Sequence, residues 1–273
     1  MRMPSSSTKA SGKVTRLIRW ELEKTFSAPM LAIMLAVALY VFVPHTFGTS
    51  NNPSSGVPSV ASLLGGWAYL WVYALGNAAS GSYMFSVFVF AAVASLSLSR
   101  DISSGYMKAL LSYPIGRARL FLSKFFVSLI VPFLVFTICL LLVGALVFPS
   151  LFVKIPLPEM AYVILIMLIQ MYFMLSISIT VSLHVRQPII SFLASVVALI
   201  GAQQVCNNLE EPYKYLVPTW GTSILMDYGQ SSTSTFFGMY SASDLLMAMT
   251  GMIIVPAALL IFNIVYFKWR FQT

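Results

Sequence analysis

The chain has 273 residues, of which 59% are hydrophobic, 14% are aromatic and 9% are charged, and its formal net charge is +8. This charged fraction excludes an ordinary soluble domain, where charged residues make up about 25%, and the hydrophobicity excludes a disordered chain. The remaining class is an integral membrane protein. Because the apolar residues form long unbroken blocks instead of the short alternating segments of a transmembrane barrel, the sequence predicts membrane-spanning helices.

The N-terminal part of the chain predicts a polar tail followed by a helix on the membrane surface. Residues 1–12 are small and polar, and we expect them to form a flexible cytoplasmic tail. In residues 13–27 the apolar side chains recur at helical spacing, and the basic ones fall mostly on the other side. This pattern is typical of an amphipathic helix that lies in the interface. A helix packed against a soluble partner is the alternative.

Six apolar blocks follow, and each is interpreted as a membrane span. They lie near residues 28–47, 79–98, 122–148, 159–183, 188–206 and 245–267. Residues 28–273 are therefore expected to form one all-α transmembrane domain. The largest loop is expected at residues 207–244 on the outer side, and a polar insert at residues 100–119 joins the second span to the third.

The positions of the basic residues predict which ends of the spans face the cytoplasm. Lys and Arg concentrate in the cytoplasmic segments of membrane proteins. With six spans, fourteen of the 16 basic residues fall on the side of the two termini, and only Lys154 and Lys214 fall on the other. The sequence therefore predicts a multi-pass protein of the cytoplasmic membrane, embedded in the lipid bilayer with both termini inside. Because the basic residues flank separate spans, no nucleic-acid partner is expected.

The insert has the features of a short helix that lies across the inner face of the membrane. Ser103 and Ser104 are candidates to cap this helix, Met107 and Leu110 recur at helical spacing, and Pro114 is expected to end it. With apolar side chains on one face and basic residues beside it, the helix suits docking into a groove on a soluble partner. An anchor on the membrane surface is the alternative.

The insert resembles the signature of the permeases of the type-2 ABC exporter family. The residues that carry the resemblance are, in chain order, Asp101, Gly105, Leu110, Leu111, Pro114, Arg117 and Lys124. The resemblance implies a six-span permease in which residues 13–27 form an elbow helix and the insert forms a coupling helix that contacts an ATPase subunit. It implies a coupling role for these residues other than Lys124, together with Tyr106 and Met107, and an elbow-helix role for Arg16, Arg19 and Trp20.

Transport is expected to be driven by a separate ATPase subunit. The sequence has no G-x-x-x-x-G-K-[ST] phosphate loop, and the centres of the expected spans hold none of the carboxylates or histidines that a proton-driven carrier needs. The resemblance implies a unit of two permeases, identical or different, and two ATPase subunits that bind ATP and Mg²⁺. The chain is expected to be no enzyme and to hold no cofactor. A membrane assembly or scaffold protein without transport activity is the alternative.

Polar and aromatic residues within the expected spans mark a candidate substrate path. They are Gln170 and Tyr172 in the fourth span, Gln203 and Gln204 in the fifth, and Asn263 in the sixth. Hydrogen bonding between helices is the alternative role for the polar ones. Arg186, in a short inner loop, is either a second ATPase contact or a topology determinant. His45 and His184 are expected at opposite membrane faces, so no metal site is predicted.

Overall fold

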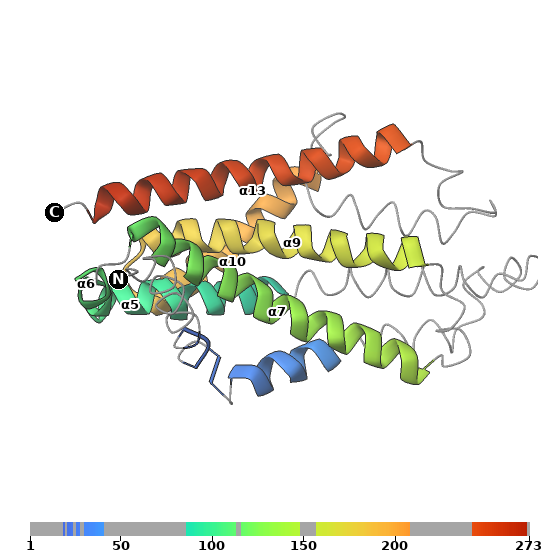
Figure 1. Ribbon diagram of the computed structural model, residues 1–273, viewed down its shortest axis with the longest axis horizontal. Helices are drawn as coiled ribbons and strands as arrows, with labels where there is room; N and C mark the ends of the chain where they lie inside the picture. Colours follow the sequence, from blue (N-terminus) through green and yellow to red (C-terminus); the bar gives the residue numbers. More distant parts are fainter. Residues whose placement is uncertain are drawn as a thin grey trace, which may run out of the picture.

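Helices make up every regular element within the ranges that the structure describes. The structure is a computed structural model, and it describes residues 19, 21–23, 26–27, 30–40, 86–112, 116–147, 157–207 and 242–271. The elements are η1 (Ser95–Ser99), α5 (Arg100–Ser103), α6 (Tyr106–Leu111), α7 (Arg117–Val147), α9 (Leu157–His184), α10 (Pro188–Asn207) and α13 (Ala242–Arg270), with further helical residues at 21–23, 30–40 and 86–94 (Figure 1). The all-α class predicted from the sequence is confirmed.

Among the described residues, four helices are long and apolar enough to cross a membrane. They are Ser86–Ser103, Arg117–Val143, Ile164–His184 and Ile253–Arg270, and they correspond to the second, third, fourth and sixth predicted spans. The first and fifth predicted spans coincide with the shorter apolar helices Met30–Tyr40 and Pro188–Ala202. A membrane crossing by these two helices stays a prediction. The predicted tail at residues 1–12 lies outside the described residues, as does most of the predicted outer loop.

The second predicted span continues further than the sequence indicated. The helix described from residue 86 passes through η1, a π-helical turn, and into α5 without a break, so it extends beyond the limit predicted for the span near residue 98. π-Helical turns occur frequently at functional sites. In η1 the side chains of Ser95, Ser97 and Ser99 are buried. The polar insert therefore starts as a direct extension of a membrane helix.

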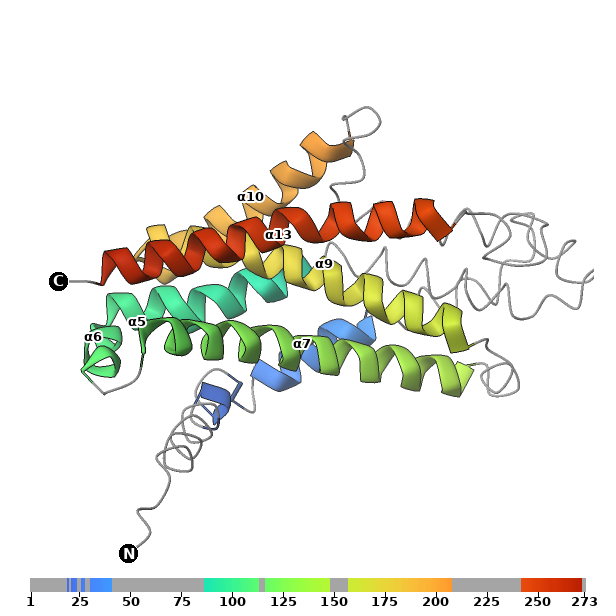
Figure 2. The ribbon, with the colours of Figure 1, turned by 45° about the horizontal axis from the view of Figure 1, so that its top comes forward.

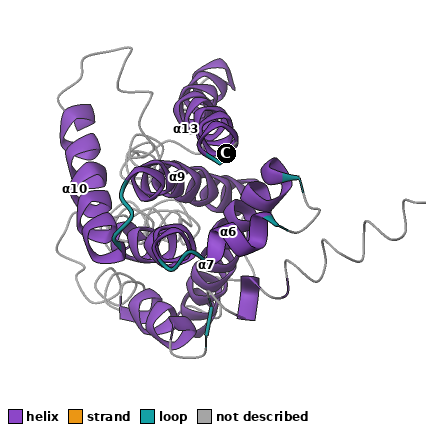
Figure 3. Cartoon of the chain, turned by 90° about the vertical axis from the view of Figure 1, so that its left-hand side faces the viewer, coloured by secondary structure: helices purple, strands orange, loops and turns teal. Residues whose placement is uncertain are grey.

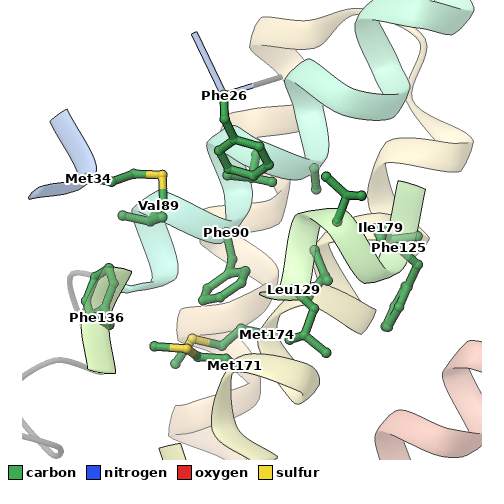
Figure 4. Packing of buried hydrophobic residues seen from close by; sticks show 14 of the residues in the cluster. Phe26, Met34, Val89, Phe90, Phe125, Leu129, Phe136, Met171, Met174 and Ile179 are labelled. Atoms are coloured by element: carbon green, nitrogen blue, oxygen red, sulfur yellow. The ribbon is translucent and has the colours of Figure 1, made fainter. Parts of the chain in front are cut away.

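Helix α9 lies at the centre of the bundle. It packs against α13, α10, α7 and η1, and Figure 2 shows it between α7 and α13. Large buried side chains fill the space between α7, α9 and residues 86–94, among them Phe90, Phe125 and Met174. Phe26 and Met34, from the N-terminal part of the chain, belong to the same cluster (Figure 4). The N-terminal residues are thus held on the bundle by apolar packing.

One end of the bundle, which we call the α6 end, collects several turns of the chain. It carries α5, α6, the turn between α9 and α10, and the C-terminal end of α13 (Figures 1 and 3). The Ser99 hydroxyl donates to the Val185 carbonyl at 2.7 Å and so joins η1 to the α9–α10 turn. The His184 ring stacks on Tyr266 of α13, with ring centroids 4.4 Å apart. The segments predicted to lie at the inner membrane face therefore meet at this end.

Candidate functional site at the α6 end of the bundle

A glycine in the left-handed conformation turns the chain between α5 and α6. Gly105 has a φ of 72°, and among the described residues no other has a positive φ. This conformation costs other L-residues roughly 1–2 kcal/mol. The Gly105 N–H donates to the Ile102 carbonyl at 3.3 Å, and the Gly105 carbonyl accepts from the Lys108 N–H at 3.0 Å. Helix α6 therefore starts at a sharp corner and lies across the end of the bundle (Figure 3).

The corner does not use the serine cap that the sequence predicted. The hydroxyls of Ser103 and Ser104 donate back to the carbonyls of Arg100 at 2.9 Å and Asp101 at 3.4 Å, within α5. The N-cap position of α6 is occupied by Gly105, which has no side chain to accept a hydrogen bond. Serine commonly bonds to nearby backbone in this way. The prediction of a Ser103 or Ser104 cap is wrong, and the direction of α6 rests on the backbone of Gly105.

Helix α6 turns its apolar face toward the bundle and its polar face outward. Met107 and Leu110 are 1% and 7% exposed and belong to the main apolar cluster, against which Leu111 also packs. Tyr106 and Lys108 are exposed. The structure thus gives Met107 and Leu110 contacts within the chain itself, and a coupling role for these two residues stays a prediction. Burial in the chain's own core removes these apolar side chains from water, which supplies the stabilisation that a partner groove would otherwise have to provide.

Behind α5, three charged side chains from separate parts of the chain meet. Lys124 Nζ, in α7, lies 2.5 Å from Glu21 Oε1 and 2.8 Å from Asp101 Oδ2, and each of the three side chains is 1% exposed. Lys124 Nζ also donates to the Ser97 carbonyl of η1 at 3.4 Å. We call Glu21, Asp101 and Lys124 the charge triad. It joins the N-terminal helical residues, α5 and α7 at one buried point.

Burial makes the charges of the triad depend on one another. Charged groups removed from water lose several kcal/mol of solvation each, and close pairing with hydrogen bonds compensates for that loss. Removing one partner of a buried ion pair typically costs about 3–5 kcal/mol. Hydrogen bonds between charged groups are also short and directional. The triad therefore fixes Glu21 in position relative to Asp101 and Lys124.

The region that contains these elements matches a known family of membrane proteins. Residues 17–202 match the family model described as ABC-2 family transporter protein. This match covers more than half of the 273 residues and includes the charge triad, α5, α6, α7 and α9. The chain belongs to the ABC-2 transporter family. It is a multi-pass membrane permease, a transport component of a kind that typically pairs with an ATPase subunit. No curated protein matches the chain.

In this ABC-2 permease the contacts of Asp101 differ from those expected. The resemblance implied that Asp101 contacts an ATPase, whereas the structure buries its side chain against Lys124. A direct contact of Asp101 with an ATPase stays a prediction. Sequence reasoning matched both residues to the family signature without predicting their contact, and assigned Glu21 no role. Two signals were available. Glu21 falls on the apolar face of its helical pattern, beside Leu17 and Ile18. Asp101, near the start of the insert, and Lys124, just beyond its end, are opposite charges 23 residues apart.

The other residues predicted to contact the ATPase, or to form the elbow helix, lie in different places. Arg117 is partly buried at the first residue of α7, and Arg186 is exposed in the turn between α9 and α10. Arg19 is exposed, and the Glu23 carboxylate, 2.9 Å from Arg19 Nε, raises the pKa of this guanidinium. The remaining three, Arg16, Trp20 and Pro114, lie outside the described residues. The elbow helix, of which residues 19 and 21–23 are described, stays a prediction.

Two residues of the candidate substrate path make contacts between helices of the permease. Asn263 of α13 is buried, and its Nδ2 donates to Thr180 Oγ1 at 3.0 Å and to the Ser176 carbonyl at 3.3 Å, both in α9. The Tyr172 ring packs edge-on against Phe125 of α7, with centroids 5.7 Å apart. These contacts favour a packing role for Asn263 and Tyr172. The other candidates are Gln170, buried in α9, Gln204, exposed in α10, and Gln203, whose side chain lies outside the described residues.

Proposed function

We propose that this permease is driven by a separate ATPase subunit, which binds the outward face of the α5–α6 segment (residues 100–112). The observation that carries the proposal is the position of α6. It lies across the end of the bundle, with Met107 and Leu110 anchored in the core and with Tyr106 and Lys108 exposed. A helix that is fixed from behind and exposed in front can receive a displacement from a partner and pass it to the membrane helices.

The α6 end is proposed to face the cytoplasm, where an ATPase can reach it. Five exposed basic side chains support this orientation, because Lys and Arg concentrate on the cytoplasmic side of membrane proteins. They are Arg100, Lys108, Arg119, Arg186 and Lys268. In this orientation the chain ends inside the cell at the C-terminal end of α13, and the ATP and Mg²⁺ are bound by the partner subunit.

Displacement of the α5–α6 segment is proposed to open and close a substrate path between this permease and a second one, identical or different. The connection between the segment and the bundle supports such a movement. Helix α5 continues through η1 into the helix that begins at residue 86, and Ser99 is bonded to the turn before α10. A push on α6 would therefore reach several helices. Export is the direction that the type-2 signature implies.

Replacing Tyr106 by Ala together with Lys108→Glu tests the proposed ATPase surface. We expect at least about tenfold weaker binding, because truncating an interface aromatic and reversing a charge each cost about 1 kcal/mol or more. The ATPase that co-purifies with a tagged permease is quantified, and its rate of phosphate release is measured. Since both side chains are exposed, the fold of the permease is expected to be unchanged.

The matched control is Lys268→Glu, which reverses an exposed basic residue at the same end but on α13. Loss of the ATPase in this control, with full binding by the double variant, would place the contact elsewhere and refute the proposed surface. A scaffold protein without transport gives a third pattern. In that case no nucleotide hydrolase co-purifies with the intact permease, or its rate does not respond to the permease.

A further inference from the structure

We infer that the charge triad is an ionic joint that makes the N-terminal helical residues and α5 move as one body. Glu21, Asp101 and Lys124 are then positioning residues, since they act by fixing helices relative to one another. The source of the movement rests on the proposed function, because the ATPase would deliver it to the α5–α6 segment. The joint itself rests on the geometry of the chain alone.

The joint brings together parts of the chain that are far apart in sequence. Lys124 lies 103 residues from Glu21 and 23 residues from Asp101, and its Nζ reaches both carboxylates. It also bonds to the Ser97 carbonyl of the π-helical turn that leads into α5. Lys124 thus contacts the helix Ser86–Ser103 at two positions, Ser97 in η1 and Asp101 in α5, one on each side of the junction between these elements. A displacement of α5 cannot leave the triad unchanged.

Charged contacts resist sliding in a way that apolar contacts do not. Two apolar surfaces that slip past each other exchange one set of weak, non-directional contacts for another. A buried ammonium that slips away from its carboxylate leaves charges unpaired in a medium of low dielectric. Phe26, Met34 and Phe90 hold the N-terminal residues on the bundle by apolar packing. The triad adds the contact that ties these residues to α5 in one relative position.

The chain also provides a route from the joint to the first predicted span. After Glu21, the Phe26 N–H donates to the Leu22 carbonyl at 3.0 Å, and the Leu31 N–H donates to the Ser27 carbonyl at 3.1 Å. These bonds link the helical residues at 21–23 to the helix at residues 30–40. A movement of α5 that carries Glu21 with it would therefore reach the first predicted span as well as the second.

Distances between spin labels test the joint in the permease without any partner. Cys139 and Cys206 are replaced by Ala, and labels are attached at Leu22→Cys, beside Glu21, and at Ser104→Cys, at the end of α5. Pulsed electron paramagnetic resonance in lipid nanodiscs is expected to give one narrow distance peak for the chain with an intact triad. Lys124→Met is expected to lose that single peak and to give a broad or shifted distribution.

A matched control removes an exposed ion pair from the same N-terminal residues. Arg19 and Glu23 are bonded at 2.9 Å but their side chains are 82% and 63% exposed, so Arg19→Gln with Glu23→Gln is expected to leave the peak unchanged. Where Lys124→Met fails to fold, the triple variant Glu21→Leu, Asp101→Leu and Lys124→Met removes all three charges together, so that no member of the triad keeps its charge without the other two. A folded triple variant with the same narrow peak as the intact chain would overturn the inference.

A second measurement separates the joint from the proposed ATPase drive. With the co-purified ATPase bound, distances from Lys268→Cys to the labels at 22 and 104 are recorded before and after trapping with MgATP and vanadate. In the intact triad both distances are expected to shift, whereas in the triple variant the shift at 104 remains and the shift at 22 is lost. Retention of both shifts in the triple variant contradicts the joint. Absence of any shift in the intact complex contradicts the proposed ATPase drive. The joint is then decided by the distance between the labels at 22 and 104 in the permease without its partner.

Discussion

At Gly105 the backbone conformation, and not lack of space, excludes other residues. A Cβ atom at this position would meet no atom within 4 Å, but φ is 72°. A Cβ atom at Gly116, on the other side of α6, would also meet no atom within 4 Å, and the φ of Gly116 is not positive. The two glycines near α6 therefore both have space for a Cβ atom but differ in the sign of φ. The left-handed conformation at Gly105 is what directs α6 across the end of the bundle.

Gly105→Ala is expected to loosen α6 from the bundle. A penalty of about 1 kcal/mol for the left-handed conformation would raise the population of locally open α6 about fivefold. The rate of tryptic cleavage after Lys108, an exposed residue of α6, measures this opening. Gly116→Ala should be cleaved at the rate of the unchanged chain, and Gly105→Asn at an intermediate rate, because Asn tolerates this conformation better. Equal rates for the two Ala variants would show that the turn carries no strain.

At the scale of helices, small buried serines determine how closely α10 packs on α9. The Oγ atoms of Ser182 and Ser191 lie 2.9 Å apart, and the Ser195 hydroxyl donates to the Ser178 carbonyl at 3.5 Å. All four serines are fully buried, and each helix carries its pair at a spacing of four residues. Small residues at this spacing allow the backbones of membrane helices to approach closely. The size of these side chains is therefore expected to matter more than their hydroxyl groups.

Two substitutions at Ser182 separate side-chain size from hydrogen bonding. Ser182→Ala is expected to lower stability by about 0.6 kcal/mol, the average for a hydrogen bond between membrane helices. Ser182→Leu is expected to lower it by about 1–3 kcal/mol, because the larger side chain forces apart a closely packed interface. Thermal unfolding midpoints of the purified permease in one detergent provide the comparison, with Ser103→Leu, an exposed serine, as the control. An Ala variant as unstable as the Leu variant would assign the effect to the hydroxyl.

At the scale of the whole molecule, the helices differ in how much of their surface the chain itself covers. Within the span windows, 67% of Ser86–Ser103 is buried but only 17% of Ile253–Arg270. Large apolar side chains of α13, such as Ile254, Ile261 and Val265, are exposed. In a membrane protein these faces contact lipid, or another protein within the bilayer. The helix Ser86–Ser103, which carries Asp101 and leads into α6, thus belongs to the interior of the bundle, and α13 to its periphery.

The arrangement of the α6 end predicts that three separate parts of the chain are reached from one side of the membrane. Single cysteines at Ser104, Arg186 and Lys268, in a chain without its native cysteines, are labelled with a membrane-impermeant maleimide. Labelling is expected in inside-out vesicles and not in right-side-out vesicles, because the proposed orientation, which follows from the positions of the basic residues, has this end in the cytoplasm. Labelling of all three from the outside would reverse the proposed orientation. Labelling from different sides would contradict the bundle itself.

Local sequence pattern was sufficient to locate most of the helices, because the length of an apolar block is a property of consecutive residues. The fourth predicted span, 159–183, corresponds to α9 at Leu157–His184, and the fifth, 188–206, to α10 at Pro188–Asn207. The short helix of the insert was predicted as well, but its N-cap was assigned wrongly to serine, and the corner at Gly105 was not predicted. The residues that matched the family signature were identified, and the ABC-2 family is now established for the chain.

The direction in which the site's side chains point depended on contacts between distant parts of the chain. The apolar face formed by Met107 and Leu110 can be buried either in a groove of a partner or in the core of the chain itself. Helical spacing cannot distinguish these two possibilities. The pairing of Glu21 with Lys124 spans 103 residues and leaves no local periodicity. The length of an apolar block is determined by consecutive residues. An ion pair and the choice of a buried helix face are determined by residues that are distant in sequence and meet only in the folded chain. The second kind of information is present only once the helices are packed.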